Sequence, residues 1–219
     1  MSPIKHVVIA AAGLGSRLGH GLPKCLVEID GMTLIERQLE LFADVPDVRI
    51  VVGYMEHAVM EAVNRLHRNV IFVRNPDFRS TTTQDSYALG AAGLEGPCVF
   101  LDADIIFEEE SLAQFMDSAQ AGEITIGVTA AKTDDAVYAR VEAVHGAPLQ
   151  VVGFTRDEPG PYEWANIVCA PADTFHRGRG PVFETLSDHL PAMAQTVVSY
   201  EIDTEQDLLR AKEYLRSIA

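Results

Sequence analysis

Short apolar runs alternate with amphipathic stretches through the first half of the chain. Runs typical of buried strands occupy His6–Ala12, Val48–Val52, Val70–Val73 and Cys98–Leu101. Between them, apolar residues recur at helical spacing over Leu34–Phe42, Glu56–Leu66 and Gln84–Leu94. This alternation predicts an α/β fold in which a mostly parallel sheet carries helices on both faces.

The second half of the chain is less regular and richer in predicted strands. These strands cover Ile124–Ala131, Ala139–Val144, Leu149–Thr155, Ile167–Ala170 and Val197–Ile202. Two prolines and a glycine within 157–162 indicate a loop. Thr204 is expected to cap a last helix that runs to Leu215, with Asp207 as the acid of a capping box. Because no linker or repeat interrupts the pattern, we expect one domain over residues 1–219.

Composition and charge argue against several classes of protein. The 219 residues are 47% hydrophobic, which suffices for a core without disulfides or a structural metal. A net charge of −15 argues against general nucleic-acid binding, which relies on clustered Lys and Arg. The sequence has no apolar run of membrane-spanning length and no signal-peptide layout at its start, and its three cysteines are isolated. We therefore expect a cytoplasmic protein without nucleic-acid or membrane partners.

A glycine-rich loop follows the first predicted strand. It reads Ala11-Ala12-Gly13-Leu14-Gly15-Ser16-Arg17 and is followed by Pro23-Lys24. Glycines let a backbone turn sharply and bring its N–H groups close to phosphates, and Arg17 and Lys24 add positive charge. A dinucleotide fingerprint would need glycine where Leu18 stands, and the Gly-Lys-Ser/Thr ending of a Walker A loop is absent. The loop therefore indicates phosphate binding, with a simple tight turn as the alternative.

Carboxylates follow two of the predicted strands. Asp102 and Asp104 lie one residue apart at the carboxyl end of a strand, where parallel sheets bind ligands. Alternate residues of an extended segment share a face, so both can point into one site, and Mg²⁺ prefers carboxylate ligands. The alternative for this pair is a solvated acidic turn. Asp203 lies between a strand and a helix, where it acts either as a helix cap or as a second metal ligand.

A polar run over residues 75–87 leads to Gln84 at the start of a predicted helix. A glutamine offers both a donor and an acceptor, as the reading of a base edge requires. The alternative is a loop that only caps the helix.

Several of these motifs together resemble the NTP-transferase family: Gly13-x-Gly15-x-Arg17 with Pro23-Lys24, Val52-Gly53-Tyr54, Asp102-Ala103-Asp104 and Glu201-Ile202-Asp203. The resemblance covers nearly the whole chain. It is closest to the small cytidylyltransferases that activate choline phosphate and similar phosphorylated or phosphonate head groups. It implies a GT-A-like, Rossmann-like three-layer sandwich with a mostly parallel mixed sheet. Residues 1–110 would form the nucleotide-binding half and 111–219 the acceptor-binding half.

The resemblance also implies roles for individual residues. The nucleotide-binding residues would be Ala11, Ala12, Gly13, Leu14, Gly15, Ser16, Gln84 and Asp102. Arg17 would contact the β- and γ-phosphates, and Lys24 would contact the α-phosphate. Asp104 and Asp203 would hold Mg²⁺, the implied cofactor.

The acceptor is expected to bind in the second half of the chain, among Glu158, Trp164 and Asn166. Trp164 is the only tryptophan, and an aromatic ring beside a carboxylate such as Glu163 can attract a quaternary ammonium group. A core tryptophan is the alternative. Glu158 and Asn166 would instead bind hydroxyl or amino groups.

The combined pattern predicts a Mg²⁺-dependent nucleotidyltransferase. An acceptor oxygen attacks the α-phosphorus of an NTP, with CTP favoured, and pyrophosphate leaves. Because the attacking phosphate or phosphonate is already ionised, no general base is needed, and the main task is to neutralise and align two anions. The expected partners are an NTP and this small acceptor, and a homodimer is possible.

Other functions fit parts of the pattern. A sugar-1-phosphate or molybdopterin nucleotidyltransferase would differ only in its base and acceptor. A GT-A glycosyltransferase also uses Asp-x-Asp, but a donor without a triphosphate has less use for Arg17 and Lys24. A non-catalytic nucleotide-binding protein would keep the glycine-rich loop but could lose Asp203. A dehydrogenase is the weakest alternative, because Leu18 replaces a required glycine.

Overall fold

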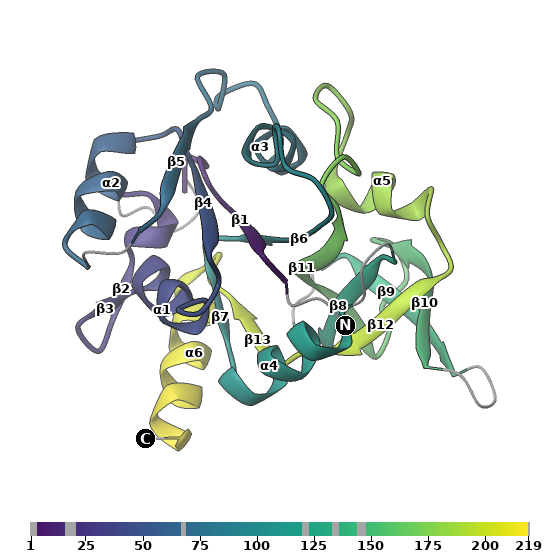
Figure 1. Ribbon diagram of the computed structural model, residues 1–219. Helices are drawn as coiled ribbons and strands as arrows, with labels where there is room; N and C mark the ends of the chain where they lie inside the picture. Colours follow the sequence, from purple (N-terminus) through teal and green to yellow (C-terminus); the bar gives the residue numbers. More distant parts are fainter. Residues whose placement is uncertain are drawn as a thin grey trace.

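A central mixed sheet organises the computed structural model, which describes residues 4–15, 21–66, 69–119, 123–132, 136–143 and 148–218. Within these ranges the sheet has nine strands in the order β5-β4-β1-β6-β11-β8-β12-β10-β9 (Figure 1). The strands are β1 His6–Ala11, β4 Asp47–Val52, β5 Ile71–Arg74, β6 Pro97–Asp102, β8 Thr125–Ala130, β9 Tyr138–Ala143, β10 Leu149–Thr155, β11 Tyr162–Pro171 and β12 Ala192–Thr196. Strands β5, β4, β1 and β6 are parallel, whereas β11 pairs antiparallel with both β6 and β8. The predicted α/β fold with a mixed sheet is confirmed.

Helices and two small strand pairs make up the rest of the secondary structure in the described residues. The helices are α1 Leu34–Leu41, α2 Glu56–Asn64, α3 Thr83–Gly90, α4 Glu109–Ser118, α5 Val182–Ser187 and α6 Glu205–Ile218, with a 3-10 turn, η2, over Lys24–Leu26. The small pairs are β2 Glu28–Ile29 with β3 Met32–Thr33, and β7 Ile105–Phe107 with β13 Ser199–Glu201. In these ranges, every helix is too short or too polar to cross a membrane.

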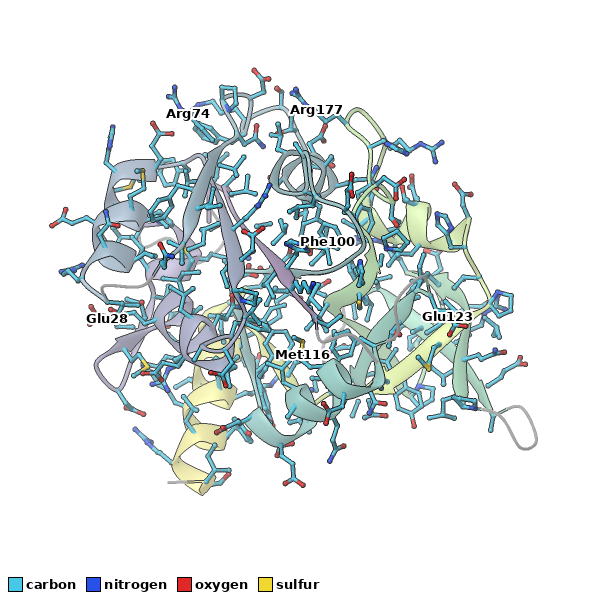
Figure 2. The ribbon with its side chains drawn as sticks, viewed as in Figure 1. Glu28, Arg74, Phe100, Met116, Glu123 and Arg177 are labelled. Carbon is cyan, nitrogen blue, oxygen red and sulfur yellow. The ribbon has the colours of Figure 1, made fainter. Side chains whose placement is uncertain are left out.

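Two hydrophobic clusters cover the two faces of the sheet. Val7 and Ile9 of β1 pack into the cluster formed with α1, α2 and α4, whereas Val8 packs into the cluster formed with α3 and α5. This alternation follows from the period of two in a strand, and it produces the expected three layers. Figure 2 shows Phe100 in the interior, where its ring centroid lies 5.3 Å from that of Tyr87 and 4.9 Å from that of Phe175.

Most predicted elements are found with small shifts, and a few were missed. Helix α3 ends at Gly90 rather than Leu94, and β11 begins at Tyr162, five residues before the predicted strand. The capping box of Thr204 and Asp207 is confirmed, with both the amide and the hydroxyl of Thr204 donating to Asp207 Oδ2. Helices α4 and α5 and strands β2, β3, β7 and β12 were not predicted from the sequence.

Gly90 allows α3 to approach the sheet closely. A Cβ atom on Gly90 would lie 2.4 Å from Val8 Cγ1 and 2.9 Å from Val51 Cγ2, inside a packed layer. We therefore expect Gly90→Ala to lower the free energy of unfolding by about 1–3 kcal/mol. Denaturant unfolding would measure the change. The control is Gly160→Ala, because a Cβ atom there meets no atom within 4 Å, and equal stability losses in both variants would contradict the packing argument.

Candidate nucleotide and metal site

A cleft of about 310 Å³ opens at the carboxyl ends of β1 and β6. In an open α/β sheet this edge is where ligands bind, because the loops that leave parallel strands meet there. The cleft is lined by Ala10, Ala11, Ala12, Gly13, Leu14, Gly15, Lys24, Cys25, Asn75, Phe78, Thr81, Thr82, Thr83, Ser86, Asp102, Ala103, Asp104 and Glu201. Most of the residues predicted to hold a nucleotide therefore share one cavity.

The glycine-rich loop forms one wall of this cleft. Gly15 adopts a φ of +63°, and a Cβ atom there would lie 3.0 Å from Leu22 O and 3.2 Å from Lys24 N. Both the backbone conformation and the close approach to Lys24 therefore favour glycine at this position. Ser16 and Arg17, which were predicted to contact the nucleotide, lie outside the described residues.

Lys24 connects the glycine-rich loop to the carboxylates of the cleft. Its Nζ donates a hydrogen bond of 2.8 Å to Asp104 Oδ2 and also hydrogen bonds to Asp203 Oδ1. Burial alone would lower the pKa of Lys24, but the negative charges of Asp104 and Asp203 outweigh it and raise this pKa above its ordinary value. Lys24 therefore carries a positive charge at neutral pH, at the end of the cleft that holds the acids.

Three carboxylates gather around this ammonium group. One oxygen each of Asp104, Glu201 and Asp203 lies within 4.8 Å of the others. The pairing of β13 with β7 brings them together, since Glu201 lies opposite Ile105 and Ile202 N donates to Asp104 O at 2.9 Å.

A divalent cation fits this set of residues. Asp104 Oδ1 is buried and has no hydrogen-bond partner among the residues that the structure describes. Burial raises the pKa of Glu201 to about 8, and the charges of Asp104 and Asp203 contribute to the shift. Burial and the charge of Asp104 likewise raise the pKa of Asp102 to about 7, although Tyr87 Oη donates to Asp102 Oδ1 at 2.8 Å. A divalent cation would stabilise the ionised forms of these acids more than the single charge of the Lys24 ammonium does.

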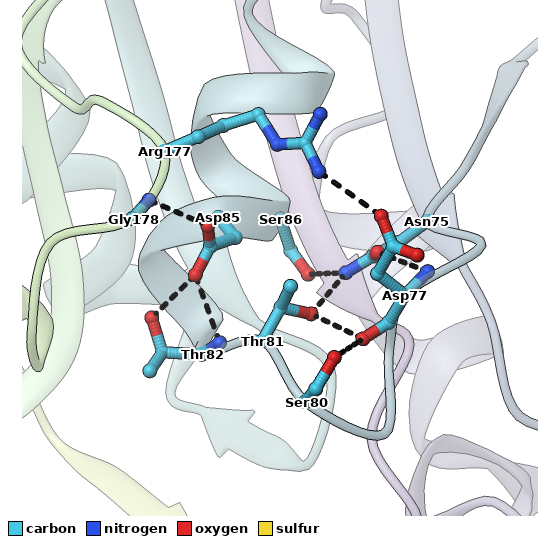
Figure 3. Close-up of polar contacts among 9 residues, drawn as sticks. All are labelled: Asn75, Asp77, Ser80, Thr81, Thr82, Asp85, Ser86, Arg177 and Gly178. Atoms are coloured by element: carbon cyan, nitrogen blue, oxygen red, sulfur yellow. Dashed lines mark hydrogen bonds and ion pairs between the residues drawn. The ribbon is translucent and has the colours of Figure 1, made fainter.

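Asn75 fixes the polar loop that forms the opposite wall. Its Nδ2 donates to Thr81 Oγ1 at 2.9 Å and to Ser86 Oγ at 3.2 Å, and its Oδ1 accepts from Asp77 N at 3.1 Å (Figure 3). These bonds join both ends of the loop. They hold Phe78 and the threonines along the cleft.

Gln84 does not lie along the cleft, and its predicted role in reading the base is not supported. Its side chain is fully buried, its Nε2 donates to His176 O at 3.0 Å, and its Oε1 accepts from Thr185 Oγ1 at 2.6 Å. Both ends of the amide are engaged within the protein. Gln84 therefore connects α3 to the segment before and within α5.

A second pocket of about 300 Å³ adjoins the cleft. It shares Thr82, Thr83, Asp102 and Glu201 with the cleft. Its other lining residues are Ala136, Val137, Arg156, Glu163, Trp164, Asn166, Pro181, Val182, Phe183 and Asp203. A molecule in this pocket would lie next to one in the cleft.

The structure brings two of the three predicted acceptor residues together. Trp164 and Asn166 both line the second pocket, and Asn166 Nδ2 donates to Glu201 Oε2 at 2.9 Å. They lie on β11, whose pairing with β8 shifts register between Trp164 and Val168. The predicted acceptor role of Glu158 is not supported, because this residue is exposed in the loop before β11 and does not line the pocket.

One carboxylate of the site, Glu201, was missed by the sequence prediction, and another, Glu163, was noted only as a neighbour of Trp164. Glu163 lines the second pocket, and its Oε2 accepts from Lys132 N at 3.1 Å. Glu201 belongs to the cluster of three acids, although only Asp203 of the same motif was predicted to bind metal. The signal for Glu201 was its spacing of two residues from Asp203, which repeats that of Asp102 and Asp104.

Curated relatives of this chain are bifunctional proteins. It is 25% identical over 224 residues to the bifunctional enzyme IspD/IspF of Clavibacter michiganensis subsp. michiganensis, covering 94% of this chain and 53% of the relative. It is 32% identical over 152 residues to the bifunctional protein GlmU of Dinoroseobacter shibae, covering 67% of this chain and 33% of the relative. The chain therefore spans one third to about half of the length of these relatives.

Solved structures share the fold over nearly the full chain. The inositol-1-phosphate CTP transferase from T. maritima superposes with a TM-score of 0.78 at 17% identity, covering 97% of this chain and 95% of that one. The CTP:phosphocholine cytidylyltransferase LicC from Streptococcus pneumoniae superposes with a TM-score of 0.73 at 20% identity, covering 98% and 100%. At these identities the likeness confirms the fold.

The family itself is shown by the sequence. Residues 7–194 match the family described as the MobA-like NTP transferase domain. This range includes the glycine-rich loop, Lys24, Asp102 and Asp104. The chain belongs to the MobA-like NTP transferase family.

Proposed function

We propose that this protein is a Mg²⁺-dependent nucleotidyltransferase. It transfers a nucleoside monophosphate from an NTP to a small phosphate or phosphonate acceptor and releases pyrophosphate. One observation carries the proposal: Lys24 lies between the glycine-rich loop and the carboxylates of Asp104 and Asp203 in a single cleft. We favour CTP because two structures of the same fold are described as CTP-dependent transferases.

The residues of the chain have separable tasks in this reaction. The backbone of Gly13, Leu14 and Gly15 is available to donate N–H groups to phosphate oxygens, and Lys24 offsets negative charge that develops at the α-phosphate. Asp104, Glu201 and Asp203 would hold Mg²⁺, which supplies further charge neutralisation and orients phosphate oxygens when it is bound.

The second pocket would hold the acceptor. Because it shares Asp102 and Glu201 with the cleft, an acceptor phosphate placed there would lie next to a nucleotide in the cleft, as transfer between them requires. Trp164 and Asn166 would contact the remainder of the acceptor. Residues 201–203, which belong to the predicted acceptor-binding half, would then also contribute to the nucleotide and metal site. Cytoplasmic location and a homodimer stay predictions.

A pyrophosphate-release screen tests this function. The protein is incubated with Mg²⁺, each of the four NTPs and each acceptor of a panel: phosphocholine, phosphoethanolamine, aminoethylphosphonate, inositol phosphate and sugar 1-phosphates. We expect release with CTP and one class of acceptor, and loss of release when EDTA removes the metal. Release with another NTP would overturn the preference for CTP. If no pair is turned over and no NTP binds with Mg²⁺, the proposed function is wrong.

A further inference from the structure

One wall of the acceptor pocket follows a segment that is held mainly by polar contacts. Residues 176–179 of this segment are exposed, and two residues later Pro181, Val182 and Phe183 line the pocket. The segment enters and leaves the hydrophobic core at Phe175 and Val182. Between these anchors little apolar area is buried, so the position of the segment depends on its hydrogen bonds.

The first turn of α3 supplies most of these hydrogen bonds. Asp85 is only 5% exposed, and its Oδ1 accepts from Gly178 N at 2.8 Å. Gln84 contributes its bonds to His176 and Thr185 from the same turn. A weaker exposed contact of 3.2 Å joins Arg177 Nη2 to Asp77 Oδ2 (Figure 3).

Asp85 also bonds to Thr82, one of the residues that the two pockets share. Its Oδ2 accepts from Thr82 N at 2.9 Å and from Thr82 Oγ1 at 3.0 Å, as Figure 3 shows. Thr82 and Thr83 line both the nucleotide cleft and the acceptor pocket. One buried carboxylate therefore bonds to the boundary between the pockets with one oxygen, and with the other to Gly178, three residues before the first residue of the segment that lines the acceptor pocket.

The charge of this carboxylate suits the arrangement. Burial alone would raise the pKa of Asp85, but hydrogen bonds from Thr82 and Gly178 hold it below its ordinary value. All three groups that face its oxygens are donors. An asparagine would have to turn its own NH₂ group toward one of these donors and would lose that contact.

We propose that Asp85 is a positioning residue that couples the nucleotide cleft to the wall of the acceptor pocket. Through Thr82 and Gly178, a nucleotide that orders the boundary between the pockets also orders residues 176–183. The inference rests on the proposed function for the identity of the two ligands. Asp85 itself is not proposed to contact the nucleotide or the acceptor.

Hydrogen–deuterium exchange on the whole protein tests this coupling without an identified acceptor. Exchange is measured with and without CTP and Mg²⁺ in the wild type and in Asp85→Asn. In the wild type we expect the nucleotide to slow exchange in residues 9–15, 78–86 and 176–184. In Asp85→Asn, basal exchange in 176–184 should rise by roughly tenfold or more, because a charge-assisted hydrogen bond is lost. Nucleotide protection of 176–184 should disappear while that of 9–15 remains.

Two further variants separate this role from a general loss of stability. Glu36→Gln is the matched control, since Glu36 accepts from Thr33 N and Thr33 Oγ1 in the capping box of α1, far in sequence from both pockets. It should leave exchange in 176–184 unchanged. Thr185→Val removes only the hydroxyl that donates to Gln84 Oε1 and should raise exchange in 176–184 less than Asp85→Asn does. If Asp85→Asn does not fold, the wild type decides: a nucleotide that protects residues 9–15 but not 176–184 would overturn the coupling.

Activity gives a second readout once the screen has identified an acceptor. In Asp85→Asn the KM of the acceptor should rise roughly tenfold, with a smaller change in the KM of CTP. Two results would overturn the inference. One is that folded Asp85→Asn exchanges in residues 176–184 at the wild-type rate. The other is that the nucleotide protects these residues equally in both proteins. If CTP protects no segment of the wild type, the proposed nucleotide site fails, whereas basal exchange in 176–184 still decides whether Asp85 holds the wall.

Discussion

Asp104→Asn should reduce pyrophosphate release by at least roughly 10²-fold and leave the fold intact. The substitution keeps the shape of the side chain but removes one of the charges that face Lys24 and the other two acids. Stability should change little, because the variant loses an ion pair and at the same time relieves repulsion from Glu201 and Asp203. Steady-state pyrophosphate release measures the first effect, and thermal unfolding measures the second.

Asp173→Asn is the matched control for this experiment. It makes the same change from acid to amide at an exposed position that lines neither the cleft nor the acceptor pocket. It should retain wild-type release. Full activity in Asp104→Asn would show that the acid cluster does not bind the catalytic metal.

Lys24→Met should have two effects of opposite direction. Turnover should fall by roughly 10²- to 10³-fold, since the charge that faces the phosphates is lost. In the absence of nucleotide, however, Mg²⁺ or Mn²⁺ should bind at least roughly tenfold more tightly, because the Lys24 ammonium no longer competes for Asp104 and Asp203. Isothermal titration of the metal into the protein alone measures this affinity.

The charge of Lys24, rather than its bulk, is the proposed cause of the competition. Lys24→Arg keeps the charge and should bind the metal no more tightly than the wild type. Without metal, Lys24→Met should unfold at a lower temperature, because Asp104 and Asp203 have lost their contact with the Lys24 ammonium, and added Mg²⁺ should reverse the loss. Metal affinity that is equal in wild type and Lys24→Met would refute the competition.

The parallel half of the fold could be predicted because its strands are buried on both faces. Strands β1, β4 and β6 then read as continuous apolar runs, and their predicted bounds agree with the structure to within one residue. Strand β11 was predicted only from Ile167 because Glu163 and Asn166 break the apolar run before it. Those polar residues line the second pocket, so the hydrophobic pattern of the strand is interrupted where it borders a cavity.

The candidate site was predictable where its residues follow a strand or a local motif. Lys24 and Asp104 line the cleft as expected, and Asp203 hydrogen bonds to Lys24. Glu201 was missed because its position depends on the pairing of two three-residue strands far apart in the sequence. Gln84 was misread because its polar amide gave no sign that Thr185 and His176 would enclose it.

The register shift within β11 separates two kinds of position on one strand. After the shift, Val168 and Cys169 are fully buried and pair with both β6 and β8, so substitutions there would disturb the sheet that carries Asp102. Before the shift and within it, Trp164 and Asn166 line the second pocket. If the second pocket holds the acceptor, its specificity can therefore evolve, or be redesigned, in residues 162–165, whereas a change at Asn166 would also reach Glu201 in the cleft.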